Sequence, residues 1–168
     1  MKLREIDKRQ YRQRLNRVIV AAIAVLTVVS LSISTTLIYF FGDETGSNFI
    51  YNLAGVVLGG ALVLQLLRHY RTHPYMEEVM YVWDLKHELN LINRKIRQIE
   101  QAAKQGNVMA MQVLHFSYQG SRQLWQLDDN TITLDELRPL MNTLEEQATA
   151  QGAKLDVNAY SRDALNQF

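Results

Sequence analysis

The sequence predicts an all-α protein in which a two-helix transmembrane hairpin is followed by a small cytoplasmic helical bundle. Two uncharged apolar runs, at residues 18–41 and 49–67, predict the hairpin. A heptad pattern of apolar residues after Pro74 predicts one long helix in the bundle. We therefore expect a basic N-terminal segment at 1–17, a transmembrane hairpin at 18–73 and a cytoplasmic helical domain at 74–168.

Both apolar runs are long enough to cross a bilayer. At ~1.5 Å per residue they reach roughly 36 and roughly 28 Å, against a hydrocarbon core of ~30 Å. Backbone amides in lipid must be satisfied within the segment, so both runs are expected to be helices. A cleavable signal peptide is the alternative for the first run. Its 24 uncharged residues exceed a usual signal core, however, and no small-x-small cleavage pattern follows them.

The distribution of charge predicts that both termini lie in the cytoplasm. Residues 1–17 carry seven Lys and Arg residues against two acidic ones, whereas the loop at 42–48 carries only Asp43 and Glu44. The positive-inside rule places the basic flanks in the cytoplasm and the loop outside. The basic collar expected to face anionic lipid headgroups consists of Arg9, Arg12, Arg14, Arg17, Arg68 and Arg71.

The second run contains a strip of small residues at helical spacing. Gly55 and Gly59 form a G-x-x-x-G pattern, and Gly60 follows it. Such residues let two helix backbones approach closely. The strip either packs the two spans of one hairpin together, which we favour, or drives dimerisation of the chain. Neither run contains an Asp, Glu, His, Lys or Arg residue, which argues against a proton relay or an ion transporter.

Apolar residues after Pro74 recur with alternating spacings of three and four, as in a coiled coil. The expected interaction seam consists of Val82, Leu85, Leu89, Ile92, Ile96 and Ile99. Gly106 and Asn107 then predict the end of this helix. The seam either pairs with the same helix of another chain or packs against a later helix of its own chain. The glycine turn favours packing within the chain.

Residues 108–127 predict a helix that is apolar on more than one face, since its only ionisable residues are His115 and Arg122. A helix of this kind is either the centre of a bundle or awaits a partner. Gly120, in its middle, marks a bend or a close approach.

The last part of the chain predicts one more helix and a polar tail. Thr133 and Glu136 have the form of a capping box, which places the start of a helix at Thr133 and its end before Gly152. Pro139 is too far inside for a regular helix, which is therefore kinked or starts later. Residues 153–168 are polar, with a weak helix from Ser161, and are expected to be loosely held.

No catalytic, cofactor or metal site is predicted. The chain contains no cysteine, which excludes disulfides and thiolate ligands. Residues 129–137 resemble the back half of a calcium loop, but its first and third positions then fall on Trp125 and Leu127, which cannot coordinate calcium. His69 and His73 have a ligand-like spacing, yet a third ligand is not obvious and Pro74 disturbs the geometry. No phosphate-binding loop or hydrolase motif is found, and no small-molecule substrate is evident.

Several segments resemble a known family. The segments are residues 52–59 (NLAGVVLG), 73–79 (HPYMEEV) and 81–86 (YVWDLK). They are similar to those of an uncharacterised family of small two-span proteins of the bacterial inner membrane. The resemblance implies an inner-membrane setting but no activity, and therefore no functional residues.

We therefore expect a non-enzymatic, membrane-anchored protein that acts as an interaction or assembly module on the cytoplasmic face. Its partners would be membrane lipid and either another protein or a second copy of the chain. Nucleic acid is not expected, because the domain at 74–168 is acidic on balance and the basic segment lies next to the bilayer. The alternatives are a dimeric relay that signals through the heptad helix and, less favoured, an enzyme acting on a membrane-associated substrate.

Overall fold

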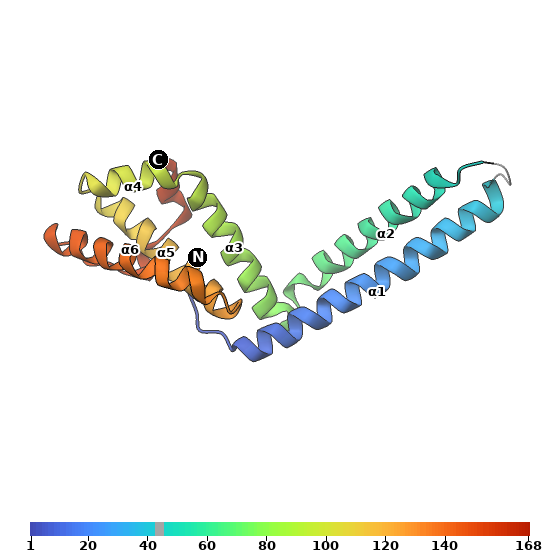
Figure 1. Ribbon diagram of the computed structural model, residues 1–168, viewed down its shortest axis with the longest axis horizontal. Helices are drawn as coiled ribbons and strands as arrows, with labels where there is room; N and C mark the ends of the chain where they lie inside the picture. The colour runs from blue at the N-terminus through green and yellow to red at the C-terminus, as the bar shows by residue number, and fades with distance from the viewer. Residues whose placement is uncertain (43–45) are drawn as a thin grey trace. The chain divides into compact units, whose positions relative to one another are not determined.

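The computed structural model describes residues 1–42 and 46–168, and of residues 131–133 the backbone alone. Its described residues are helical, without strands, which confirms the all-α class. The elements are α1 (Lys8–Phe41), α2 (Phe49–His69), η1 (Tyr70–Thr72), η2 (Pro74–Met76), α3 (Glu77–Arg94), α4 (Ile96–Lys104), α5 (Val108–Leu127), α6 (Thr131–Ala150), η3 (Val157–Ala159) and η4 (Arg162–Gln167) (Figure 1). They form two compact units, a hairpin unit (Arg9–Met80) and a helical body (Met1–Lys8 with Tyr81–Phe168).

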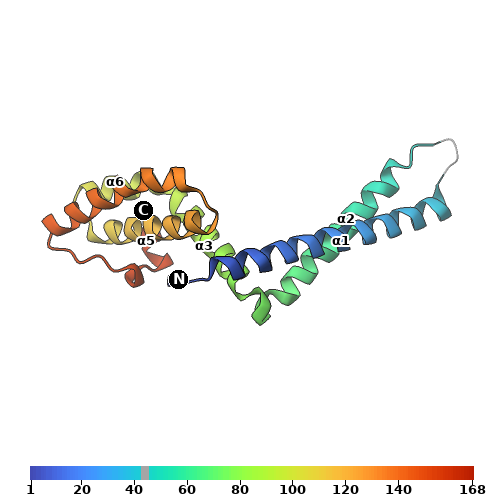
Figure 2. The ribbon, with the colours of Figure 1, turned by 60° about the horizontal axis from the view of Figure 1, so that its bottom comes forward.

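The hairpin unit consists of α1 and α2, which run side by side in opposite directions (Figures 1 and 2). Both helices are long and apolar enough to cross a membrane. Helix α1 ends at Phe41 and α2 begins at Phe49, as predicted. The acidic loop residues Asp43 and Glu44 lie outside the described residues. Helix α1 starts ten residues before the apolar run, so the second half of the basic segment is helical.

After α2 and η1, the chain changes direction at His73. This residue has an extended backbone, with φ −69° and ψ 137°, because the proline that follows disfavours the helical region. The predicted boundary between Pro74 and the preceding helix is thus confirmed.

In the helical body, α5 is the central helix, and it contacts α4, α6 and both turns of the C-terminal segment. Its buried side chains include Met111, Val113 and Phe116. Gly120 makes a close approach to α3, since a Cβ atom there would lie 3.2 Å from both Leu85 Cδ1 and Leu89 Cδ2. Of the two interpretations of 108–127, the structure therefore has the helix at the centre of a bundle.

The long heptad helix is interrupted. The sequence predicts one helix through Ile99, but α3 ends at Arg94 and α4 begins at Ile96. Lys95, between them, has φ −112° and ψ 8°, and its amide bonds the Ile92 carbonyl three residues back. Its ammonium group donates to the Leu165 carbonyl at 2.8 Å. The heptad spacing continues through this break, so the pattern does not reveal it.

Helix α6 also differs from its prediction. It begins at Thr131, so Thr133 lies in its first turn rather than at the N-cap position. It runs without interruption across Pro139 to Ala150. Gly152 follows with a positive φ of 64°, as expected for a residue that ends a helix.

The C-terminal segment is packed, which corrects the expectation of a loosely held tail. Tyr160, Ala164 and Leu165 are all buried. The Gln112 amide donates to the Lys154 carbonyl at 2.7 Å and accepts from the Asp156 backbone amide at 2.9 Å. Polar composition misled the prediction because these three residues reach the core although most of the segment is polar.

Candidate functional site

The glycine strip forms the contact between the two hairpin helices. Gly55 and Gly59 are buried, and a Cβ atom at Gly55 would lie 2.5 Å from the Ser30 carbonyl oxygen. A Cβ atom at Gly59 would collide with the Ser30 hydroxyl. Gly60 differs, because a Cβ atom there meets nothing within 4 Å. Two of the three predicted glycines, Gly55 and Gly59, therefore contact the other helix, and they do so within one hairpin.

Two serines of α1 face this strip. The Ser34 hydroxyl donates to the Asn52 side-chain carbonyl, which joins the helices through a polar contact. Ser30 is buried as well, and its hydroxyl has no hydrogen-bond partner among the described residues. Small side chains are what allow the two backbones to approach here.

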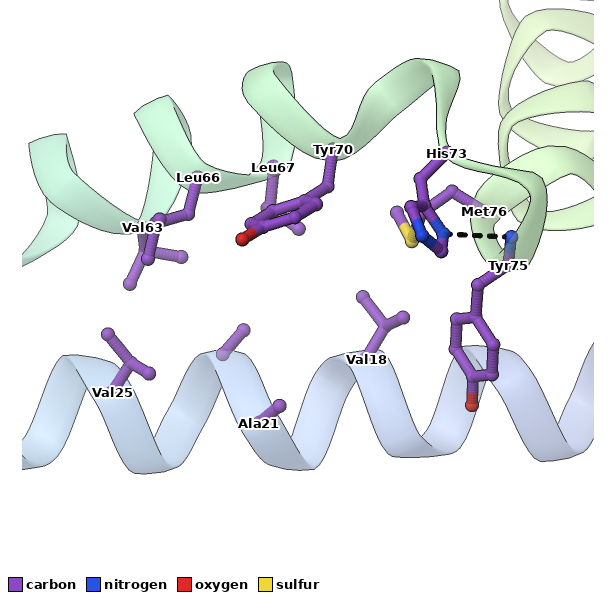
Figure 3. Close-up of a pocket in the computed structure, with 11 residues that line it drawn as sticks. Val18, Ala21, Val25, Val63, Leu66, Leu67, Tyr70, His73, Tyr75 and Met76 are labelled. Atoms are coloured by element: carbon purple, nitrogen blue, oxygen red, sulfur yellow. Dashed lines mark hydrogen bonds between the residues drawn. The ribbon is translucent and has the colours of Figure 1, made fainter.

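An open cavity of about 360 Å³ lies between the other halves of the two helices (Figure 3). Its aliphatic walls come from α1 through Val18, Ala22 and Val25, and from α2 through Val63, Leu66 and Leu67. Volumes of this size are typical of small-molecule sites. The hairpin is thus closely packed towards its loop and open towards its other end.

One end of the cavity carries aromatic and polar groups. Tyr70, His73 and Tyr75 line this part of the cavity, with the Tyr70 ring projecting from η1 towards α1 (Figure 3). His73 Nδ1 accepts a hydrogen bond from the Tyr75 amide at 3.1 Å. This leaves Nε2 of a neutral ring as a donor.

The basic collar predicted to face lipid is only partly available. Arg14 is half-buried, donates to Glu78 and to the Pro74 carbonyl, and lies 5.3 Å from the centre of the Tyr75 ring. Its charge is therefore engaged within the hairpin unit. The other residues of the collar are exposed: Arg9, Arg12, Arg17, Arg68 and Arg71.

The predicted interaction seam lies inside the helical body. Val82, Leu85, Ile92 and Ile99 are buried. Leu89 and Ile96 are half-buried. Of the two alternatives for the seam, the structure therefore has the favoured one, packing within the chain.

The body also contains a buried carboxylate, Glu88, which is 2% exposed. Tyr160 donates its hydroxyl hydrogen to it at 2.7 Å, and Arg162 donates from Nε to both carboxylate oxygens. The Tyr160 ring stacks on Phe116 with centroids 4.1 Å apart. We call Glu88, Tyr160 and Arg162 the C-terminal clasp, because they tie the last segment to α3.

Electrostatics in the body follow from burial and from this clasp. Burial acts to raise the pKa of Glu88, but the hydrogen bonds from Arg162 and Tyr160 outweigh it, so the pKa is lowered. Burial and the bond to Glu88 both raise the pKa of Tyr160. Burial lowers the pKa of His115, against the opposing effect of Glu145 and Asp156. These shifts favour an ionised Glu88 and a neutral His115.

The N-terminal segment is fixed to the body by a second polar network. The Tyr81 hydroxyl donates to the Gln123 side chain at 3.0 Å and accepts from the Arg4 amide at 3.0 Å. Gln123 in turn donates to the Arg4 carbonyl at 2.6 Å. The Arg4 guanidinium lies 4.7 Å from the centre of the Tyr81 ring. Lys8 pairs with Asp129.

Comparison with known proteins places the chain by its family. Residues 1–165 match the model of a family described as a protein of unknown function (DUF3087). The chain belongs to the DUF3087 family. No curated protein and no solved structure is significantly similar to it.

In this DUF3087 chain, sequence reasoning missed the C-terminal clasp and the Arg4 network. Glu88 falls between seam positions in a helix with many charges, and Arg162 lies 74 residues away from it. The available signal was that the polar tail contains two aromatic residues, Tyr160 and Phe168, and that Arg162 lies close to the first of them in sequence. That signal does not identify their partners.

Proposed function

We propose that the chain is a non-enzymatic, membrane-anchored protein whose hairpin is inserted in a bacterial inner membrane with both ends in the cytoplasm. The observation that carries this proposal is the outward surface of the hairpin. Val20, Val28 and Leu31 on α1 are 62–66% exposed, and Ile50, Val57 and Leu64 on α2 are 57–72% exposed. Large exposed apolar surfaces need a cover, and lipid supplies one to helices of this length.

The proposed role of the body is that of an interaction or assembly module. It has its own buried core, yet it leaves Trp83 on α3 67% exposed. Tryptophan is enriched among the residues that contribute most to protein interfaces. The helix at 108–127, for which a partner was one of two alternatives, is largely covered by its own chain. We therefore propose Trp83 as the contact surface.

A dimeric relay is a weaker proposal. The two surfaces that the sequence assigned to it, the Gly55–Gly59 strip and the heptad seam, both pack within one chain. An enzymatic role is weaker as well, since the buried Glu88 has its oxygens engaged by Tyr160 and Arg162.

Photo-cross-linking in intact cells tests the interaction role. A photoreactive amino acid replaces Trp83 in one variant and the exposed Gln101 on α4 in the other. We expect a discrete adduct, with a protein partner or a second copy, from position 83 only. Adducts of equal yield from both positions, or none from either, contradict an interface at Trp83. Resistance of both variants to alkaline extraction from membranes checks the anchor independently.

A further inference from the structure

The cavity between α1 and α2 has the chemistry of a lipid-chain site. Its walls are aliphatic on both helices, including Val18 and Val25 on one side and Val63 and Leu66 on the other (Figure 3). Water needs several polar partners to occupy a cavity, whereas apolar cavities take apolar ligands. In a hairpin surrounded by bilayer, the apolar material next to an open cavity is an acyl chain.

The charge around one end of the cavity favours an anionic headgroup. Arg17 directly precedes the lining residue Val18, and Arg68 directly follows the lining residue Leu67. Both arginines are exposed. Anionic lipids are attracted to basic residues at the membrane surface.

The same end provides neutral hydrogen-bond donors. His73 has its Nδ1 engaged by the Tyr75 amide, so that Nε2 can donate, and the Tyr70 hydroxyl lies beside the apolar walls. Phosphate oxygens accept such bonds. Apolar walls, two hydrogen-bond donors and the arginines next to the lining residues therefore supply the kinds of contact that a phospholipid makes.

We propose that the cavity holds one acyl chain of an anionic phospholipid, with its phosphate bound at the end marked by Tyr70, His73, Arg17 and Arg68. This inference rests on the proposed insertion of the hairpin in a membrane. It makes the hairpin a lipid-selective anchor, because binding depends on the headgroup as well as on the chain.

Native mass spectrometry of the full-length protein tests the proposal. The protein, delipidated in mild detergent, is titrated with phosphatidylglycerol or phosphatidylcholine, and the fraction carrying one lipid is measured. We expect phosphatidylglycerol to bind at lower concentration. Arg17→Gln and Arg68→Gln should each weaken it roughly fivefold, which corresponds to about 1 kcal/mol per basic residue. Equal binding of both lipids overturns the headgroup part of the proposal.

Cavity-filling variants test the place of binding. Ala22→Phe and Val63→Phe put a ring into the cavity, while Ala24→Phe and Leu64→Phe make similar changes at exposed neighbouring positions outside it. We expect the lipid adduct to be lost in the first pair and kept in the second. Equal adducts in both pairs overturn the cavity site. A dimer that excludes lipid also overturns it, because a second copy is then the occupant.

Two further measurements separate this inference from the proposed function. A cross-link between Ser34→Cys and Asn52→Cys, whose native side chains touch, confirms that each filling variant keeps its hairpin. Alkaline extraction shows whether the wild-type protein is embedded in membranes. If it is embedded and binds no lipid adduct, only the lipid site is wrong. If it is extracted, the proposed function is wrong.

Discussion

The helical body and the hairpin unit treat large apolar side chains in opposite ways. Leu85, Ile92 and Phe116 of the body are fully buried, whereas Val28, Leu31 and Leu58 of the hairpin are more than half exposed. Both units consist of helices, so helix formation alone does not explain the contrast. The body hides its apolar surface from water, and the exposed apolar surface of the hairpin is the basis of its proposed place in a membrane.

Truncation of a leucine in each unit gives the largest expected difference. Leu85→Ala in the body leaves a cavity and should lower the free energy of unfolding by about 2–5 kcal/mol. Leu58→Ala, on the outward face of α2, leaves no such cavity and should cost under ~1 kcal/mol. Thermal unfolding of the full-length protein in detergent, followed by circular dichroism, measures both. An equal loss in the two variants would show that Leu58 is packed inside protein.

A second comparison separates the glycines of α2. Gly55→Ala places a methyl group against the Ser30 backbone, which cannot move without parting the helices, and should cost about 1–3 kcal/mol. Gly60→Ala meets open space and should stabilise α2 by up to ~1 kcal/mol. The yield of the cross-link between Ser34→Cys and Asn52→Cys reports on each change. If Gly60→Ala lowers the cross-link yield as much as Gly55→Ala does, the claim that Gly55 contacts α1 and Gly60 does not is wrong.

The C-terminal clasp predicts a smaller effect in the body. Tyr160→Phe removes one hydrogen bond to Glu88 but keeps the ring stacked on Phe116, so the cost should be about 0.5–1.5 kcal/mol. Proteolysis of the C-terminal segment under native conditions should become faster. The matched control is Tyr118→Phe on α5, which leaves the clasp intact. A loss of protection in the control alone would contradict the role of the clasp.

The smallest predicted effect is a dependence of stability on pH. Two groups, His115 and Glu88, have lowered pKa values in the folded state. For each of them, the unfolded state binds more protons at pH values between its folded and unfolded pKa. Stability should fall as the pH drops below the ordinary 6.5 of His115, and again below the ordinary 4.5 of Glu88. His115→Gln should abolish only the first decrease in melting temperature. A first decrease that persists in this variant would assign it to another group.

Local composition predicted the hairpin well and the body less well. The end of α1 at Phe41 and the start of α2 at Phe49 follow from where uncharged residues stop, which is a local property. At the break, Lys95 donates to the carbonyl of Leu165, and the clasp joins Glu88 to Arg162. Contacts between residues so far apart in the chain leave no periodic signal. The heptad pattern identified the buried face correctly but could not show which chain buries it.

The glycines illustrate the same limit at the candidate site. The G-x-x-x-G spacing predicted a close helix contact, and Gly55 and Gly59 make one. The neighbouring cavity had no sequence signal. It lies between Ala22 and Val25 of α1 and Leu66 of α2, whose side chains line it without filling it. The distance between the two helices decides whether a small residue contacts the other helix or borders a cavity.

Cysteine accessibility in intact cells tests most directly whether the hairpin crosses the membrane with both ends in the cytoplasm. The chain has no native cysteine, so Ser47→Cys, Lys2→Cys and Ser161→Cys each provide one exposed thiol. We predict that a membrane-impermeant maleimide labels position 47 in intact cells, and positions 2 and 161 only after the membrane is permeabilised. Labelling of position 2 or 161 in intact cells, or protection of position 47, would contradict this topology.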